Sequence, residues 1–185
     1  MGGVTCNVTL PIVFNDYIIR KITIDDSTSA YKMRKSVASC CDTILATSEE
    51  ISLEGMKLWI DSWLRNDRRL FVVVEDKRNI VGQLWVWFSD SKAKLAHVAE
   101  IGLEVLSAYQ GQGIGSKLFE IGVEWARQAG AMRIQVQTLE RNEPMGKIIE
   151  KNGFEYEGTK HCYINNYGNY ENMVCYARLF CKNDD

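Results

Sequence analysis

Residues 110–116 read Gln-Gly-Gln-Gly-Ile-Gly-Ser, between a strand-like segment at 97–105 and a helix-like segment at 117–129. The first main-chain N–H groups of a helix have no partner within the helix, and the helix dipole favours negative charge there. The glycines at 111, 113 and 115 carry no Cβ atom, so a bulky anion can lie directly against the backbone. The sequence therefore predicts an anion site at this turn, and a pyrophosphate is its natural ligand.

Glycines of this kind also occur in three other types of turn. A dinucleotide-binding turn requires Gly-x-Gly-x-x-Gly in a βαβ unit that opens the chain, and neither is present. A P-loop requires Gly-Lys-Ser/Thr after the glycines, and that is absent too. A plain turn remains as the alternative, although three alternating glycines cost conformational entropy unless the backbone needs them.

Composition indicates an ordinary globular protein. The chain has 185 residues, of which 46% are hydrophobic and 25% charged, and its net charge is −2. This length predicts one domain, 1–185, with a short lead-in at 1–15. The absence of a basic excess argues against a nucleic-acid partner. No apolar run approaches the roughly 18 residues of a membrane span, and no signal peptide is evident, so we expect no membrane partner.

The cysteines and histidines do not form a metal-binding pattern. The two histidines, His97 and His161, lie far from ligand spacing, and no Cys-x-x-Cys pair occurs among the six cysteines at 6, 40, 41, 162, 175 and 181. We therefore expect no metal, and reduced thiols in a cytoplasmic protein.

Hydrophobic periodicity predicts a mixed α/β (α+β) fold. Expected helices cover 30–38, 53–65, 117–129 and 143–151, and expected strands cover 17–23, 70–75, 80–88, 96–105, 132–138, 154–158 and 173–181. The order predicts a sheet of about six to seven strands that is mostly antiparallel and is flanked by about four helices. One parallel pair is expected, between 96–105 and 132–138, because the helix at 117–129 joins them.

This pattern resembles the GNAT superfamily of acetyl-CoA-dependent N-acetyltransferases, in particular its small bacterial branch. The resemblance covers 17–181. Its sharpest part is Gln110-Gly-Gln-Gly113-Ile-Gly115, which fits the family's Arg/Gln-x-x-Gly-x-Gly/Ala signature. Arg141-Asn142-Glu143 and Glu150-Lys-Asn-Gly-Phe154 follow at the expected distance, since the family commonly has an Asn about ten residues before Gly-Phe.

The resemblance implies that acetyl-CoA lies where the strand at 96–105 splays from the strand at 132–138. The backbone at 103–105 would pair with the pantetheine arm, and the N–H groups of 111–116 would hold the pyrophosphate. Asn142 would contact the arm, or would only cap the last helix. The implied cofactor-binding residues are Leu103, Glu104, Val105, Gln110, Gly111, Gln112, Gly113, Ile114, Gly115, Ser116 and Asn142.

Acetyl transfer needs a neutral amine, so a proton must leave it. Glu100 is our candidate base, because it lies on the strand before the turn, where some members of the family carry a catalytic glutamate. Glu104 shares its strand face and is the alternative; His97 is a candidate proton relay. The simpler interpretation of Glu100 is a half-exposed strand residue paired with a neighbouring cation.

One residue departs from the family pattern. Many members have a tyrosine four residues before the Gly of Gly-Phe, where it protonates the sulfur of the leaving CoA. This chain has Ile149 there, and isoleucine cannot donate a proton. Either another group does so, with Tyr156, Tyr163, Tyr167 and Tyr170 as candidates, or the thiolate leaves unassisted.

Two functions stay open. The first is an N-acetyltransferase for a primary amine (a small amine, polyamine, drug or peptide/protein amine), acting by direct attack in a ternary complex. The alternative is a GNAT-fold regulatory module that binds acetyl-CoA with little turnover. The acceptor pocket is expected from 26–65 and 160–172, where aromatic and acidic side chains would suit a cationic amine. The strand at 173–181 is a candidate sheet edge for a homodimer.

Overall fold

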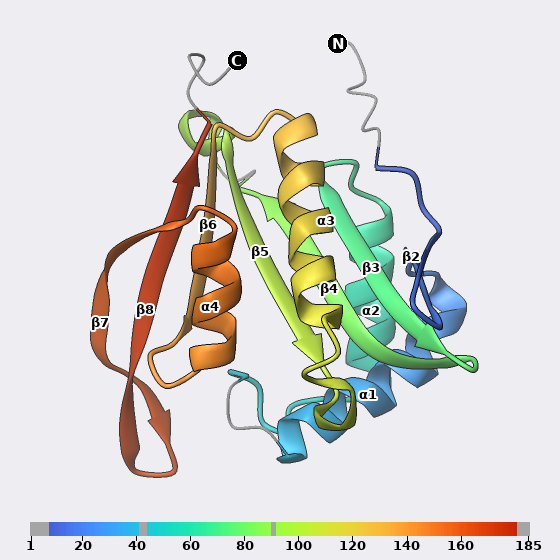
Figure 1. Ribbon diagram of the computed structural model, residues 1–185. Coiled ribbons are helices and arrows are strands. Elements are labelled where there is room, and N and C mark those ends of the chain that lie inside the picture. The colour runs from blue at the N-terminus through green and yellow to red at the C-terminus, as the bar shows by residue number, and fades with distance from the viewer. Residues whose placement is uncertain (1–7, 41–43, 90–91, 181–185) are drawn as a thin grey trace.

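A computed structural model describes residues 8–40, 44–89 and 92–180. A single eight-stranded sheet runs through the molecule in the order β1-β2-β3-β4-β5-β6-β8-β7 (Figure 1). Every neighbouring pair is antiparallel except β5 and β6. The strands are β1 (Ile12–Phe14), β2 (Tyr17–Lys21), β3 (Arg69–Asp76), β4 (Asn79–Phe88), β5 (Val98–Val105), β6 (Arg133–Leu139), β7 (Glu155–Asn166) and β8 (Asn169–Leu179).

Four helices cover the two faces of the sheet. Helices α3 (Ile114–Gln128) and α4 (Glu143–Lys151) lie on one face, which we call the front, and α1 (Ser27–Cys40) and α2 (Leu53–Leu64) lie on the back (Figure 1). One hydrophobic cluster fills the space under α3 and a second fills the space under α1 and α2. The predicted mixed fold, its single parallel pair and its four helices are confirmed.

Helix α3 shows why the sequence folds this way. Its apolar stripe, Ile114, Leu118, Ile121 and Trp125, is buried as its helical spacing predicts. Gly130 follows with a φ of 91°, a left-handed conformation that ends a helix without a Cβ penalty. The helix therefore begins directly at the glycine turn and carries the chain from β5 to the parallel strand β6.

The sequence prediction differs from the structure at both ends of the sheet. The lead-in contributes an eighth strand, β1, which pairs with β2 through Ile12↔Ile19, so the sheet begins before residue 17. Strands β7 and β8 are longer than predicted. The prediction that 173–181 forms an edge is wrong, because β8 lies between β6 and β7, and the edge strand is β7.

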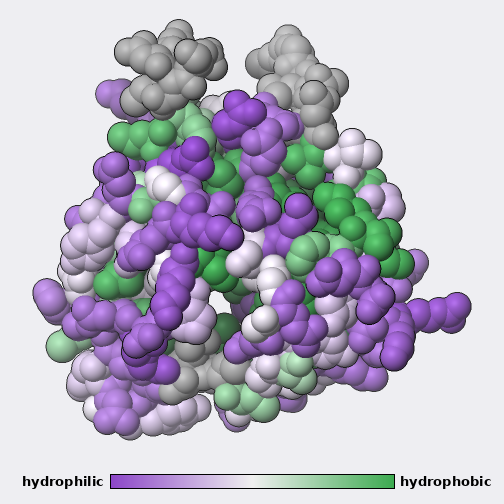
Figure 2. Space-filling view, in the orientation of Figure 1, coloured by the Kyte–Doolittle hydropathy of each residue, from purple (hydrophilic) through white to green (hydrophobic). Residues whose placement is uncertain are grey.

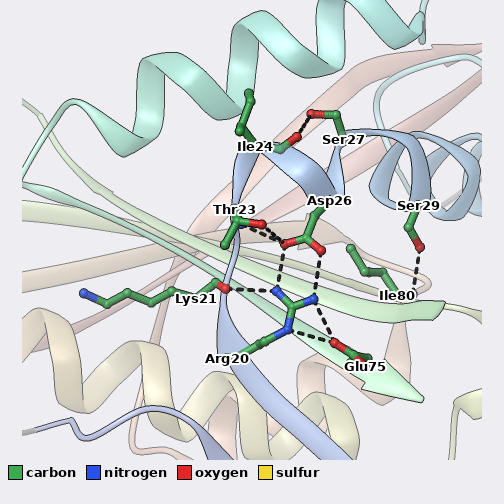
Figure 3. A network of polar contacts seen from close by, with 9 residues as sticks. All are labelled: Arg20, Lys21, Thr23, Ile24, Asp26, Ser27, Ser29, Glu75 and Ile80. Atoms are coloured by element: carbon green, nitrogen blue, oxygen red, sulfur yellow. Dashed lines mark hydrogen bonds and ion pairs between the residues drawn. The ribbon is translucent and has the colours of Figure 1, made fainter. Parts of the chain in front are cut away.

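A polar network fixes the start of α1 against the sheet. Arg20 of β2 donates to both carboxylate oxygens of Asp26, at 2.7 and 2.8 Å, and to Glu75 of β3 at 2.8 Å (Figure 3). Asp26 also accepts from the main-chain N–H and the hydroxyl of Thr23, which forms a capping box. Its pKa is lowered because these bonds outweigh burial, which acts in the opposite direction. The network positions α1 over the back of the sheet.

Candidate active site

Strands β5 and β6 separate soon after they meet. Their ladder has three residue pairs, from Val98↔Arg133 to Glu100↔Gln135. On its other side, β5 pairs with β4 from Ala99 to Val105. The edge of β5 at 101–105 is therefore open toward β6. Figure 2 shows the front surface hollowed near its centre, over the space between α4 and the beginning of α3.

The glycine turn lies at the lower end of this gap. Gly113 precedes α3 with a φ of 82°, and no side chain caps the first N–H groups of the helix. Gly111 also has a positive φ of 75°, and a Cβ atom there would meet nothing within 4 Å, so the turn is open on that side. The turn thus presents bare main-chain donors.

Neighbouring side chains hold the turn in place. The Tyr17 hydroxyl donates to Gln112 from β2, and the Tyr109 hydroxyl donates to Asp76 of β3 over 2.9 Å. Gln110, predicted as a donor to the ligand, gives one amide N–H to the carbonyl of Val105 at 3.2 Å. Its side chain closes the loop, and its contact with a ligand stays a prediction.

The other predicted cofactor residues divide by what they can offer. Ile114 and Val105 have buried side chains, and Leu103 packs against the same cluster, so these residues offer main-chain groups. Gly115 and Ser116 form the half-buried first turn of α3. Asn142 is the N-cap of α4, where its side chain accepts from the Met145 N–H at 3.4 Å. Its capping role is confirmed, and its contact with a cofactor stays a prediction.

Glu100 lies where the two strands part, and its side chain is half-buried. Burial raises the pKa of the Glu100 carboxyl above its ordinary value, opposed by a hydrogen bond from Gln135 and by the charge of Lys160. A raised carboxyl pKa suits proton acceptance from an amine near neutral pH better than an ordinary one. His97 is exposed just before β5, and its role as a proton relay stays a prediction.

Glu104 has a different environment although it shares the strand face of Glu100. Its side chain is 3% exposed, accepts from the amide of Gln83 at 2.7 Å and lies 3.7 Å from Nε of Arg34. Burial raises the pKa of the Glu104 carboxyl despite the opposing influence of Arg34 and Gln83. These contacts turn the carboxylate into α1 and away from solvent, so Glu100 is the more accessible of the two candidate bases.

Sequence reasoning missed Arg34 and Gln83. The one available signal was spacing, since Arg34 falls on the inward face of α1 with Ala30, Met33 and Val37. Gln83 is fully buried within an otherwise apolar strand and gave no signal beyond its polarity. Two tryptophans surround Arg34, with its guanidinium carbon 4.5 Å from the ring centre of Trp59 and 5.7 Å from that of Trp85.

An open cavity of about 620 Å³ lies between the end of α1 and the β7–β8 turn. None of the side chains that line it is charged, and most of them are polar. They are Ala38, Ser39, Cys40, Ser48, Asn166, Tyr167 and Asn169. The predicted acidic lining is not found there: Asp26 pairs with Arg20 and Glu171 with Arg141, while Asp42 falls outside the described residues.

Ile149, at the family's tyrosine position, is fully buried.

The described ranges contain no group of three or more His, Cys, Asp or Glu suited to a metal ion. In the same part of the chain, every helix is too short or too polar to cross a bilayer.

The open edge of β5 and the bare donors before α3 fit a long ligand with an anionic middle, as acetyl-CoA is. Comparison with known proteins decides the family. The model of the acetyltransferase (GNAT) family matches residues 35–154, more than half of the chain. The chain belongs to the GNAT family.

Its curated relatives are distant. A 105-residue segment is 30% identical to the L-amino acid N-acetyltransferase AaaT of Escherichia coli and covers 55% of this chain and 62% of AaaT. A segment of the same length is 24% identical to a putative ribosomal protein bS18-alanine N-acetyltransferase of Bacillus subtilis, covering 57% of this chain and 66% of the relative. The chain thus spans somewhat less than two thirds of either relative.

Solved structures agree on the fold. A GNAT acetyltransferase from Streptococcus pneumoniae has a TM-score of 0.82 at 20% identity, with 89% of this chain and 99% of that one covered. The yncA acetyltransferase of Salmonella typhimurium, solved with its cofactor acetyl-CoA, also reaches 0.82, at 15% identity and 92% and 98% coverage.

Proposed function

We propose that this GNAT protein transfers the acetyl group of acetyl-CoA to a primary amine by direct attack in a ternary complex. The observation that carries the proposal is the gap between β5 and β6, which begins after three residue pairs and leaves the edge of β5 at 101–105 open. An open strand edge accepts an extended chain by main-chain hydrogen bonds, as an added strand does. The pantetheine arm is such a chain, and the turn at Gly113 lies where its pyrophosphate would be.

Each part of the gap has one task. The main chain of 103–105 orients the arm, and the N–H groups at the beginning of α3 hold the pyrophosphate. A main-chain N–H on the open edge of β5 donates to the oxyanion that forms at the carbonyl. Acetyl-CoA supplies the activated acyl group, so no enzyme nucleophile is needed. Asn142 fixes the start of α4 beside the gap.

Glu100 serves as the proton acceptor for the attacking amine, directly or through one water. It is the half-buried carboxylate at the point where the strands part, and its raised pKa matches the task. Ile149 is buried and provides no acid for the CoA sulfur, so the thiolate leaves toward solvent in this assignment. This position favours the alternative function, a module that binds acetyl-CoA with little turnover.

Thiol release separates the two functions. We expect free CoA to appear when the protein is mixed with acetyl-CoA and members of a panel of amino acids, polyamines, aminoglycosides and peptides. Calorimetry of acetyl-CoA binding is the companion measurement. Binding without release for every acceptor would leave only the regulatory module, and absence of binding would overturn both.

The names of the relatives give different acceptors: L-amino acids for AaaT, ribosomal protein alanine for a putative enzyme, and phosphinothricin for a second putative enzyme of Bacillus subtilis, YwnH. We extend to this chain only their common feature, a primary amine. A single domain over 1–185, a cytoplasmic location and a homodimer stay predictions. If a homodimer forms, the edge strand β7 is the sheet edge on the gap side that is available for pairing.

A further inference from the structure

We propose that Arg34 binds the carboxylate of the acceptor, which makes the acceptor a small amino acid rather than a simple amine or a protein N-terminus. The inference rests on the proposed function and concerns the same site. Arg34 belongs to no motif of the sequence, and the structure brings it beside the open segment of β5.

The guanidinium of Arg34 is fixed on three sides. Trp59 and Trp85 lie around it at 4.5 and 5.7 Å from its central carbon, and Glu104 lies 3.7 Å from Nε. Stacking on aromatic rings and a neighbouring carboxylate restrict the plane of the side chain. The Gln83 amide in turn holds Glu104. Arg34 is thus oriented before any ligand arrives.

The outer nitrogens of the Arg34 guanidinium, Nη1 and Nη2, are available to bind a ligand. Nε is buried, whereas the side chain as a whole is 22% exposed. Within the described part of the chain, no group accepts a hydrogen bond from Nη1 or Nη2, and neither is a buried unpaired atom, so both reach solvent. Two parallel N–H donors on an oriented guanidinium match the two oxygens of a carboxylate.

The contact with Glu104 does not by itself explain this geometry. A distance of 3.7 Å between Nε and Oε1 is an ion pair without a hydrogen bond. A guanidinium that served only to neutralise Glu104 would gain most from two short bonds to it, as Arg20 forms with Asp26. Arg34 instead presents one edge to Glu104 at long range and keeps its fork for another partner.

Arg34 lies beside Glu104, at the far end of the open segment of β5 from Glu100. Glu104 belongs to the β5 segment that we assign to the pantetheine arm, and Glu100 lies four residues earlier, about 13 Å along the strand at 3.3 Å per residue. Arg34 and Glu100 therefore lie at the two ends of the open edge on the back face. Ala38, one helical turn after Arg34 on the same side of α1, lines the open cavity at the end of that helix.

The test compares each acceptor with its own primary amide. CoA release is assayed with four acids, L-alanine, L-methionine, L-phenylalanine and 4-aminobutyrate, and with the four matching amides. The proteins are wild type, Arg34→Gln, Arg34→Lys and the control Lys32→Gln. Lys32 is an exposed residue of α1, so this control removes the same charge from the same helix. The acid and its amide differ in amine basicity, and the ratio of their kcat/KM values between variants cancels that difference.

We expect the acid-to-amide ratio to fall roughly 10- to 100-fold in Arg34→Gln, the size of one or two charged hydrogen bonds. Arg34→Lys keeps the charge but loses the two parallel N–H donors, so its acid-to-amide ratio should fall by a smaller factor. Lys32→Gln should keep the wild-type ratio. An equal loss for acids and amides in Arg34→Gln, accompanied by a lower melting temperature, would mean a purely structural arginine and overturn the inference.

Other outcomes distinguish this inference from the proposed function. CoA release confined to polyamines or peptide N-termini would overturn the amino-acid acceptor and leave acetyl transfer standing. If no acceptor releases CoA, the proposed function fails, and calorimetry of the same amino acids against the CoA-loaded protein decides the role of Arg34. Binding of the acids that Arg34→Gln abolishes would support the carboxylate site, and equal binding or none would refute it.

Discussion

In the proposed function, the front and the back of the gap bind their ligands by different means. On the front, the turn before α3 offers main-chain N–H groups, and the open edge of β5 offers further main-chain groups. On the back, the proposed contacts with the acceptor come from side chains, namely Glu100 and Arg34, which pairs with Glu104 among tryptophans. Main-chain recognition tolerates sequence change outside the glycines, whereas side-chain recognition changes with each substitution. The comparison explains how a family can keep one cofactor while its acceptors differ.

The largest loss of activity is expected from a substitution on the back of the gap. We expect Glu100→Gln to lower kcat/KM for an amine acceptor about 10²- to 10⁴-fold, because the amide cannot accept the amine proton. The affinity for acetyl-CoA should be unchanged, since the front of the gap is untouched. Steady-state kinetics and calorimetry on the same preparation test both statements.

The pH profile sharpens this prediction. Glu100 must be ionised to act as a base, and burial raises its pKa, so wild-type kcat/KM should fall as pH drops through that raised pKa. The variant should lack this acid limb and keep the limb of the amine itself. Glu54→Gln, an exposed carboxylate of α2, is the control. Full activity of Glu100→Gln at neutral pH would remove Glu100 as the base.

The second largest effect belongs to the front. Gly113→Val introduces a β-branched side chain at a φ of 82°, with its Cβ atom 3.5 Å from the Phe14 ring, so the turn must distort and its main-chain donors must move. We expect CoA to bind on the order of 100-fold more weakly, about 2.8 kcal/mol at 1.4 kcal/mol per tenfold change. Calorimetry with CoA provides the value.

The matched control for this change is Gly168→Val. Gly168 has a φ of 92° in the β7–β8 turn, so it carries the same backbone strain far from the glycine turn. It should lower stability by a similar amount and leave the affinity for CoA near wild type. Similar losses of affinity in the two variants would mean that the turn binds nothing and that strain alone was measured.

The difference between the two sides also decides what the sequence could predict. The front was predictable because 110–116 is contiguous and its glycines are needed for one backbone shape; α3, β5 and β6 followed from hydrophobic periodicity. The arrangement on the back could not be predicted. Its residues Arg34, Gln83 and Glu104 come from α1, β4 and β5, and only the tertiary structure brings them together.

The same reasoning explains the errors at the sheet ends. Strand β1 has three residues and follows Pro11, too short a run for a periodic signal. The order β6-β8-β7 places the last strand inside the sheet, and pairing order between strands is a long-range property that no local pattern encodes. The glycine turn also contains a contact that the sequence did not predict, the hydrogen bond from the Gln110 amide to the carbonyl of Val105.

A third effect concerns how α1 is held over the back. We expect Asp26→Asn to lower the free energy of unfolding by about 2 kcal/mol at pH 7, because it breaks charged hydrogen bonds to Arg20. The folded pKa of Asp26 is depressed, so this stability is present above the unfolded pKa, about 3.9, and is lost as pH falls through the folded value. Denaturation of both proteins at pH 7 and at pH 2 should show the difference shrinking in acid.

Asp61→Asn is the control for this prediction, because Asp61 forms an exposed pair with Arg65 one helical turn away. Such pairs contribute about 0–1 kcal/mol, so little change is expected at either pH. A loss as large as that of Asp26→Asn would show that any carboxylate substitution has this effect and that the Arg20 network is not special.

The smallest effect is expected on the front of the gap, for a side chain that holds the glycine turn in place. The Tyr17 hydroxyl donates to Gln112 and ties the glycine turn to β2. Tyr17→Phe removes one hydrogen bond at an exposed site, which is typically about 0.5–1.5 kcal/mol, so CoA should bind roughly two- to tenfold more weakly. Tyr170→Phe, on an exposed ring of β8, should bind CoA as wild type does. If calorimetry shows no loss for Tyr17→Phe, the turn is ordered by its own backbone, and recognition on the front is independent of side chains altogether.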